Sequence, residues 1–128
     1  MKMMAKLQIL AVDDNSISLA AIEQELKGDY EVICVNSGVR ALKYLTRNIP
    51  DLILLDIQME QKDGLETLRE IRAMPNCKGI PVIILTSKQD KSTVLESSKL
   101  GIIDYVLKPF NRDDLHNRVD RILKDIYI

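Results

Sequence analysis

Residues 7–14 have the sequence LQILAVDD, a short apolar run that ends in two adjacent aspartates. Two later stretches have the same character: LILLD at 52–56 ends in an aspartate, and VIILT at 82–86 ends in a threonine. Runs this short and this continuously apolar are typical of strands that helices cover on both faces, because neither face meets water. These stretches therefore predict three buried strands of a parallel sheet.

Two further strands and five helices complete the predicted order. Residues 30–35 and 105–107 are the remaining apolar runs, and Lys108 and Pro109 close the second of them. The segments between the runs carry apolar residues at helical spacing, so the chain consists of five consecutive β–α units. Such units form parallel strands with crossover helices on both faces of one sheet. We expect residues 1–128 to form a single domain.

The predicted helices are recognised by the residues at their ends and by their apolar stripes. Ser37 and Asn111 are expected to cap two helices at their N-termini. Gly28 and Gly101 are expected to end two others, and a further helix stops before Pro75. The helix residues expected to face the core are Ile17, Ala21, Ile22, Leu26, Val39, Leu42, Leu45, Leu65, Leu68, Ile71, Val94, Leu95, Leu100, Leu115, Val119, Ile122, Leu123 and Ile126.

Composition narrows the functional classes. Of the 128 residues, 46% are hydrophobic and 29% are charged, the balance of an ordinary globular domain with a sizeable core. The formal net charge is −1 and aromatic residues make up 4%, so neither a basic surface nor a stacking platform for nucleic acid is expected.

Cysteine usage and hydropathy bear on the compartment. Cys34 and Cys77 form no CxxC pair, which favours two reduced cysteines, one in a strand and one in a loop. Every apolar run is too short to cross a bilayer, and the residues before Asp13 lack an adequate signal-peptide core. We therefore expect a cytoplasmic protein without membrane association.

Polar residues follow four of the predicted strands. They are Asp13 and Asp14 after the first, Asp56 after the third, Thr86 after the fourth and Lys108 after the fifth. Ligands of an open parallel sheet bind beyond the carboxyl ends of the strands, so we expect these side chains to meet at one rim. Gathered carboxylates repel each other unless a cation lies beside them, and oxygen ligands without His or Cys favour Mg²⁺. One aspartate after a strand is commonly a turn or helix cap, but an adjacent pair together with Asp56 favours a metal site.

Lys108 and Thr86 give this rim a fixed positive charge and a hydroxyl donor. Together with a metal ion, they supply more positive charge and more hydrogen-bond donors than the carboxylates alone require. The rim is therefore suited to receive a dianion such as a phosphoryl group. Pro109 cannot continue a central strand, which favours a strand that stops where the Lys108 ammonium points inward.

Five fragments at these strand ends form a recognisable set. They are VDDN at 12–15, LLDIQM at 54–59, DG at 63–64, LTS at 85–87 and YVLKPF at 105–110. In this order, across essentially the whole chain, they resemble the response-regulator receiver domain of two-component signalling. The resemblance implies a flavodoxin-like (βα)5 fold, a doubly wound parallel five-stranded sheet with strand order 2-1-3-4-5, and one receiver domain over residues 1–128.

The resemblance also implies a role for each residue of the rim. Asp56 is the implied phosphoacceptor, which attacks a phosphohistidine of a sensor kinase. Asp14 and Asp56 are implied direct ligands of Mg²⁺ or Mn²⁺, and Asp13 acts largely through water. Gln58 offers its backbone carbonyl to the ion, and Lys108 pairs with the phosphoryl oxygens.

Thr86 and Tyr105 form the implied switch. Phosphorylation adds about one and a half to two negative charges beside Asp56 and draws Thr86 toward them, helped by the Ser87 backbone amide. Tyr105 resembles the family's aromatic switch residue, which rotates inward to fill the space that Thr86 leaves. The surface of the fourth helix, fifth strand and fifth helix then changes. The alternative for Tyr105 is a half-buried strand residue with its hydroxyl in water.

Some positions depart from the common family pattern or vary within it. Glu60 stands where many receivers have proline, so we expect a different loop without a lost ligand. Gln58 and Lys88 occupy positions that tune water access to the phosphoryl group. His116 is the only histidine and is expected to be a solvent-facing helix residue, not a phosphorelay histidine.

The leading hypothesis is a phosphorylation-activated signalling switch that is not an enzyme. Its implied partners are a sensor histidine kinase or phosphotransfer protein and a downstream effector protein, with no direct contact to nucleic acid or membrane. We expect a stand-alone monomer, with dimerisation on phosphorylation left open.

Four alternatives stand beside this hypothesis. The closest is a receiver excised from a multidomain regulator, either a transcription factor or an output enzyme. A haloacid-dehalogenase-type phosphatase needs D-x-D on the first strand, whereas Asp13 and Asp14 are adjacent and Asp56 is on the third. A flavin or nucleotide binder needs a Gly- or Ser/Thr-rich phosphate loop where residues 13–15 place negative charge. A degenerate receiver that is never phosphorylated is disfavoured by the complete acidic, Thr and Lys set.

Overall fold

The computed structural model of the protein describes residues 6–59, 63–87 and 91–127. Within these ranges five strands alternate with five helices in the predicted order. The strands are β1 (Gln8–Val12), β2 (Glu31–Val35), β3 (Leu52–Asp56), β4 (Val82–Thr86) and β5 (Asp104–Leu107). The helices are α1 (Ser16–Leu26), α2 (Gly38–Leu45), α3 (Gly64–Ala73), α4 (Lys91–Lys99) and α5 (Arg112–Tyr127), with a short 3-10 turn, η1 (Pro75–Cys77), after α3. Glu60 and Lys88 lie outside the described residues.

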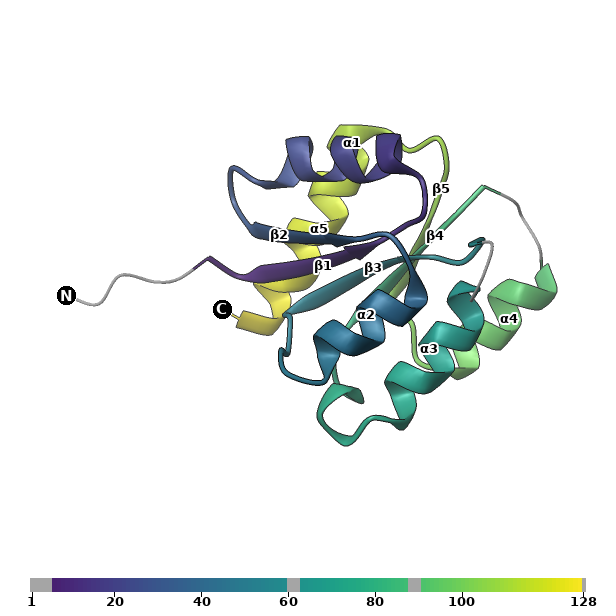
Figure 1. Cartoon of the computed structure of the whole chain (residues 1–128). Coiled ribbons are helices and arrows are strands. Elements are labelled where there is room, and N and C mark those ends of the chain that lie inside the picture. Colours follow the sequence, from purple (N-terminus) through teal and green to yellow (C-terminus); the bar gives the residue numbers. More distant parts are fainter. Residues whose placement is uncertain (1–5, 60–62, 88–90, 128) are drawn as a thin grey trace.

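The strands form one parallel sheet in the order β2-β1-β3-β4-β5. Figure 1 shows the helices in two layers, with α1 and α5 on one face of the sheet and α2, α3 and α4 on the other. This is the predicted flavodoxin-like, doubly wound arrangement, and it is confirmed. The strand order reverses between β1 and β3, so the crevice at their carboxyl ends is the expected place for a ligand.

Two hydrophobic cores hold the three layers together. Side chains alternate between the faces of a strand, so Ile9 and Ala11 of β1 pack with α1 and α5, whereas Leu10 and Val12 pack with the opposite helices. All residues of β3 and β4 are buried. The continuous apolar runs therefore correspond to strands covered on both faces, as predicted.

Four residues that were predicted to face the core are exposed, so these predictions are wrong. They are Ile17, Val39, Leu95 and Ile126, and Ile17 is 79% exposed. Ile17 and Val39 lie in the first turns of α1 and α2, and Ile126 lies in the last turn of α5. A residue at the end of a helix has packing neighbours on one side only. Leu95 is predicted to be buried together with Val94, but consecutive helical residues point about 100° apart. The Val94 side chain lies outside the described part of the chain.

Asn15 is the N-cap of α1. Its side-chain oxygen accepts the backbone N–H groups of Ile17 and Ser18 at 2.9 and 3.1 Å. Neither Asp13 nor Asp14 therefore serves as the cap, which was the alternative use for a carboxylate at this position.

The other predicted helix ends are mostly correct. Ser37 caps α2 and Asn111 accepts an N–H in the first turn of α5, at 3.1 and 2.9 Å. Gly101 follows α4 with φ of +80°, the left-handed conformation that glycine adopts without strain. The prediction that Gly28 ends α1 is wrong. The helix ends at Leu26, Lys27 follows in a right-handed conformation, and Gly28 has no positive φ.

The cysteine prediction is confirmed: Cys34 lies in β2, Cys77 lies in η1, and both are free. Among the described residues, no helix is both long enough and apolar enough to pass through a membrane.

Gly64 is required where α3 begins against the end of β3. A Cβ added at Gly64 lies 2.2 Å from the backbone oxygen of Asp56 and 2.5 Å from the Cα of Ile57. Those are backbone atoms that cannot move without displacing Asp56. The glycine therefore allows α3 to start directly beside the aspartate that ends β3.

We predict that Gly64→Ala lowers the free energy of unfolding by about 2–3 kcal/mol, because the new methyl group forces the backbone of the β3 end aside. Gly28→Ala is the matched control, since an added Cβ there meets nothing within 4 Å, and its stability should stay within about 0.5 kcal/mol of the original. Urea unfolding of both variants measures the difference. Equal stabilities would show that the close approach imposes no constraint.

Candidate functional site

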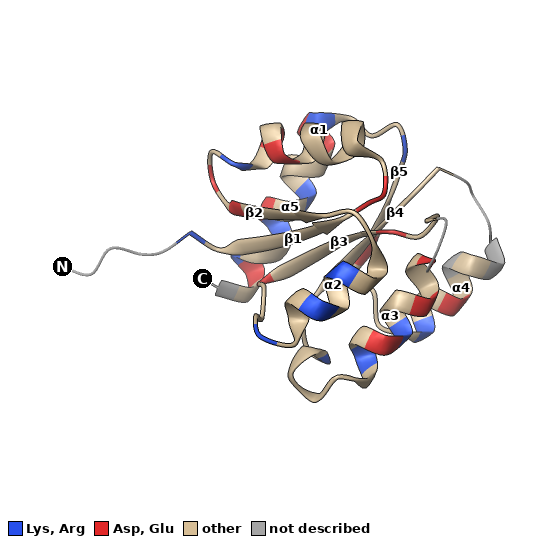
Figure 2. Cartoon of the chain, viewed as in Figure 1, with Lys and Arg blue, Asp and Glu red and all other residues tan. Residues whose placement is uncertain are grey.

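The register of the sheet aligns the strand ends that carry the candidate residues. Val12 pairs with Leu55 across β1 and β3, which places Asp13 beside the end of β3 that carries Asp56. Asp56 in turn pairs with Leu85, and Thr86 pairs with Leu107 immediately before Lys108. Parallel pairing alone thus brings residues from four strands to one rim. Figure 2 shows acidic segments following β1 and β3 at the same edge of the sheet.

Asp13, Asp14 and Asp56 form a compact acidic cluster at this rim. One carboxylate oxygen from each lies within 4.8 Å of the others. Asp13 is fully buried at 0% exposure and Asp56 is 4% exposed, whereas Asp14 is exposed. Two of the three carboxylates have therefore lost most of their contact with bulk water.

Lys108 is the cation that faces the two buried carboxylates. Its Nζ lies 2.5 Å from Oδ2 of Asp13 and 3.5 Å from Oδ2 of Asp56. In the described part of the chain, this one ammonium faces two buried carboxylates, which leaves an excess of negative charge between them. The ion pair with Asp13 holds the ammonium beside Asp56.

Backbone amides orient the other oxygen of each buried carboxylate. The N–H of Asn15 donates to Oδ1 of Asp13 at 2.9 Å, and the N–H of Gln58 donates to Oδ1 of Asp56 at 3.0 Å. Each carboxylate is thus held by an amide on one oxygen and faces Lys108 with the other. This arrangement leaves little rotational freedom at the site.

The pKa of Asp56 is raised to about 6. Burial is the largest cause, since it disfavours the charged form, and the charge of Asp13 and a hydrogen bond with it raise the pKa further. The Gln58 amide and the Lys108 ammonium oppose the rise because both favour the ionised carboxylate. The protein therefore maintains an ionised Asp56 at neutral pH against a desolvation cost.

The donor set of the rim fits a hard divalent cation. Only oxygen ligands are present in the acidic cluster, and among the described residues Lys108 is shared by its two buried carboxylates. Asp13, Asp14 and Asp56 are the side chains that could hold such an ion, with the backbone of Gln58 on the adjacent loop. Oxygen-only ligands of this charge suit Mg²⁺ and Mn²⁺ better than zinc.

The Gln58 side chain bridges the loops after β3 and β4. Its Oε1 accepts the backbone N–H of Ser87 at 3.2 Å and also accepts the Ser87 hydroxyl. Sequence reasoning assigns the Ser87 amide to an incoming phosphoryl group, but here that donor is already engaged. Thr86, just before it, is buried at the end of β4.

Tyr105 is the β5 residue for which the switch role is predicted. It is 45% exposed, as is typical of one face of an edge strand, while its neighbour Val106 is buried. Leu107, two residues on, is also exposed on β5.

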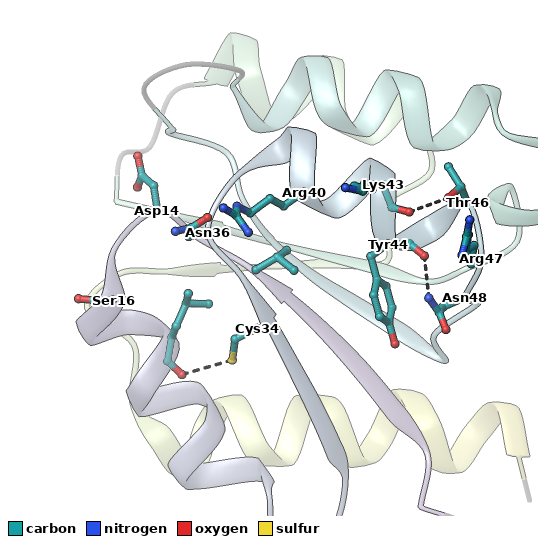
Figure 3. Close-up of a pocket in the computed structure, with 12 residues that line it drawn as sticks. Asp14, Ser16, Cys34, Asn36, Arg40, Lys43, Tyr44, Thr46, Arg47 and Asn48 are labelled. Atoms are coloured by element: carbon teal, nitrogen blue, oxygen red, sulfur yellow. Dashed lines mark hydrogen bonds between the residues drawn. The ribbon is translucent and has the colours of Figure 1, made fainter.

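A separate cavity of about 820 Å³ lies over the free edge of β2, between α1 and α2. Figure 3 shows that its cationic side chains, Arg40, Lys43 and Arg47, come from α2 and the turn after it, and that Asp14 lies at one end. The cavity is not lined by Asp13, Asp56 or Lys108. It shares Asp14 with the acidic rim and otherwise lies beside it.

His116 is only partly solvent-facing, with 22% of its side chain exposed, and its contacts were not predicted. Its ring packs against α1 and the turn that follows, with Nδ1 2.8 Å from Glu25 and Nε2 2.9 Å from Asp29. Sequence spacing carries no signal for these contacts, because the partners lie 91 and 87 residues away along the chain.

Comparison with known proteins points to one family. The family model described as the response regulator receiver domain matches residues 9–120. The transcriptional regulatory protein ZraR of Escherichia coli O157:H7 is 35% identical over 123 residues, which cover 95% of this chain. They cover 27% of ZraR, so the chain spans about a quarter of that relative's length.

Solved structures agree with the sequence comparison. The chemotaxis protein CheY4 of Vibrio cholerae superposes with a TM-score of 0.87 at 27% identity, covering 92% of this chain and 99% of CheY4. The phosphorylated cyanobacterial phytochrome response regulator RcpA superposes with a TM-score of 0.80 at 33% identity, covering 92% of this chain and 91% of RcpA.

We predict that Asp56→Asn stabilises the metal-free protein at neutral pH. Because the folded-state pKa of about 6 lies above the unfolded value of 3.8, stability falls as the pH rises between these two values, and the loss is complete above about pH 6. After allowance for partial solvent screening, we expect the gain to be about 1–2 kcal/mol at pH 8. It should shrink toward zero as the pH falls to about 4, where the folded protein already carries the proton.

Urea unfolding of both proteins between pH 4 and 8, in the presence of a chelator, measures this difference. A stability difference that does not vary with pH would show that ionisation of Asp56 does not destabilise the folded protein.

Proposed function

The chain belongs to the response regulator receiver domain family of two-component signalling, and on that premise we propose that it is a phosphorylation-activated switch with Asp56 as the phosphoacceptor. One observation carries the proposal: Asp56 is held through Oδ1 by the Gln58 amide, while Oδ2 lies 3.5 Å from Nζ of Lys108. A carboxylate fixed on one oxygen and faced by a cation on the other is oriented to attack a phosphorus atom.

In the proposed reaction, a carboxylate oxygen of Asp56 attacks the phosphorus of a phosphohistidine on a sensor kinase or phosphotransfer protein. A P–O bond forms, the P–N bond breaks, and its electron pair returns to the imidazole nitrogen. Lys108 compensates the phosphoryl oxygens that arrive beside Asp56, because its ammonium is already held there by Asp13. Positioning and charge compensation are the main requirements of such a transfer.

We further propose that Asp13, Asp14 and Asp56, together with the backbone carbonyl of Gln58, hold Mg²⁺ or Mn²⁺. The support is the excess of negative charge and the oxygen-only donor set of the cluster. When bound, the ion supplies positive charge that screens the carboxylates from the phosphoryl group.

The proposed switch connects Asp56 to β5. A phosphoryl group beside Asp56 attracts the Thr86 hydroxyl at the neighbouring strand end, and Tyr105 turns inward from its exposed position. The added charge biases the protein between two arrangements of this region. Exposed apolar side chains on α4 and β5, namely Leu95, Tyr105 and Leu107, support a protein effector that reads the difference.

The phosphodonor has a suitable docking surface beside the rim. A cavity of about 350 Å³ is lined by Lys108 and Ser87 from the site and by Ile17, Pro109 and Phe110. The high exposure of Ile17 is explained if its side chain packs against the donor protein. We place the sensor kinase or phosphotransfer protein on this surface.

Two comparisons support the proposal. RcpA, similar over nearly its whole length, is described as phosphorylated. The chain matches 27% of ZraR, a transcriptional regulatory protein that is much longer than the matched part. This supports a second arrangement, in which the same receiver controls the output domains of a longer regulator, such as a transcription factor. In either arrangement we propose residues 1–128 as one receiver domain that signals and does not turn over a substrate of its own.

We also propose a cytoplasmic location and a monomer that contacts neither nucleic acid nor membrane directly. The free thiols of Cys34 and Cys77 are consistent with a reducing compartment. As the alternative to an effector, we propose that the exposed side chains of α4 and β5 pair two phosphorylated copies of the chain.

We predict that incubation with acetyl phosphate and Mg²⁺ adds one phosphoryl group per chain and that Asp56→Asn abolishes it. Asp51→Asn is the matched control, because Asp51 precedes the same strand at its opposite end and accepts the Gln8 amide. This control should be phosphorylated normally. Intact-protein mass spectrometry counts the groups, and label retained by Asp56→Asn would refute the assignment.

We predict that Gln58→Ala speeds phosphorylation by acetyl phosphate about two- to fivefold, because losing the side chain releases the Ser87 donors that Gln58 occupies. The backbone carbonyl proposed for the metal is unchanged in this variant. Initial rates at fixed Mg²⁺ measure the effect. If Gln58→Ala has the same effect in a Ser87→Ala background as in the original chain, the bridge is not its cause.

A further inference from the structure

A second group of metal-ligating side chains lies far from the acidic rim. The His116 cluster, defined as Glu25, Asp29, His116 and Asp120, joins α1, the turn after it and α5. Asp29 precedes β2, so it lies toward the amino ends of the strands, opposite the edge where the phosphoacceptor lies. Figure 1 shows α1 and α5 on the same face of the sheet, where this cluster connects them.

The distances within the His116 cluster suit a tetrahedral metal ion. Nε2 of His116 lies 2.9 Å from Oδ2 of Asp29 and 3.6 Å from Oδ1 of Asp120. Ligand atoms bound to tetrahedral zinc at about 2.0–2.1 Å lie about 3.3–3.4 Å apart, a value between these two distances. One ligand atom from each of the three residues falls within 4.8 Å of the others.

The neighbours of these ligands hold them in the orientation that a metal requires. Nδ1 of His116 lies 2.8 Å from Oε2 of Glu25, so an N–H at Nδ1 donates to Glu25. Nε2 faces the two aspartates, and a metal ion would take the place of its proton. The Tyr30 hydroxyl donates to Oδ1 of Asp120 at 2.5 Å and fixes that carboxylate. A carboxylate behind the histidine is the common support of a zinc-binding imidazole.

The charges of the cluster are suited to a cation. Three carboxylates surround one imidazole, and in the described ranges no Lys or Arg forms an ion pair with Glu25, Asp29 or Asp120. A proton on His116 balances one of these negative charges, and the Glu25 contact is the largest cause of its raised pKa. A dication that replaces this proton balances one charge more.

We propose that Nε2 of His116 and the carboxylates of Asp29 and Asp120 bind a transition-metal dication, with Zn²⁺ the best match and water as the fourth ligand. The mixed imidazole and carboxylate set is distinct from the oxygen-only rim that suits Mg²⁺. Glu25 acts behind His116 as the acceptor of its Nδ1–H. The bound ion links α5 to the turn after α1 and stabilises the contact between these helices.

The single histidine of the chain makes a direct test possible, because the imidazole nitrogen resonances in a ¹⁵N NMR spectrum come from His116 alone. The protein is titrated with Zn²⁺ at pH 8 in the presence of excess Mg²⁺, which occupies the acidic rim. We expect one equivalent of Zn²⁺ to shift Nε2 while Nδ1 keeps its proton. Imidazole resonances that stay unchanged up to a tenfold excess of Zn²⁺ would overturn the proposal and leave His116 as an ion-pair partner only.

Variants separate this site from the acidic rim. Asp29→Asn and Asp120→Asn should each weaken Zn²⁺ binding at least about tenfold, and Glu25→Gln should weaken it about 10- to 100-fold, the range for a residue that supports a ligand. Asp113→Asn, which removes the same charge from an exposed position on α5, should change nothing. Asp14→Ala should also leave the His116 resonances responsive to Zn²⁺.

Thermal unfolding gives a second measurement. Zn²⁺ should raise the unfolding temperature of the original chain and of Asp113→Asn but not that of His116→Gln. An equal zinc-dependent rise in His116→Gln would place the ion elsewhere and overturn the proposal.

Discussion

The contact between Lys108 and the buried carboxylates is the interaction on which the site depends. Lys108 lies 2.5 Å from Asp13 and 3.5 Å from Asp56, and both carboxylates are almost entirely removed from water. Without a cation, two buried negative charges at this separation would protonate or draw in water. The ammonium therefore offsets the charge of both buried carboxylates, and it lies where the proposed function needs a cation.

The ion pair does not neutralise the rim, because one ammonium faces two buried carboxylates. Asp14 adds a third carboxylate, and the pKa of Asp56 remains raised to about 6 because burial outweighs the help from Lys108 and the Gln58 amide. This shortage of positive charge supports the divalent cation that we propose for the site. Gly64 allows α3 to begin directly against the backbone of Asp56, so the end of β3 stays in place beside the helix.

Much of the fold was predictable because the chain alternates short apolar runs with amphipathic segments. The runs at 52–56 and 82–86 become strands that are buried on both faces. The helix faces were less predictable, since the periodicity that marks Ile17 as apolar does not reveal that no other element covers it. Likewise, the Gln58 side chain could not be assigned to Ser87, because that bridge depends on how two loops approach each other.

By itself, the sequence predicted which polar residues meet at the rim: aspartates, a threonine and a lysine that follow the apolar runs. The carboxyl ends of parallel strands lie at one edge of the sheet, so the residues that follow them come together there. Their proximity therefore follows from the local sequence pattern and the direction of the chain. Only the tertiary structure decided the pairings between distant segments. Tyr30 meets Asp120 and Glu25 meets His116 because α1 and α5 pack on the same face of the sheet. No spacing along the chain encodes such contacts, since they arise from the packing of whole helices.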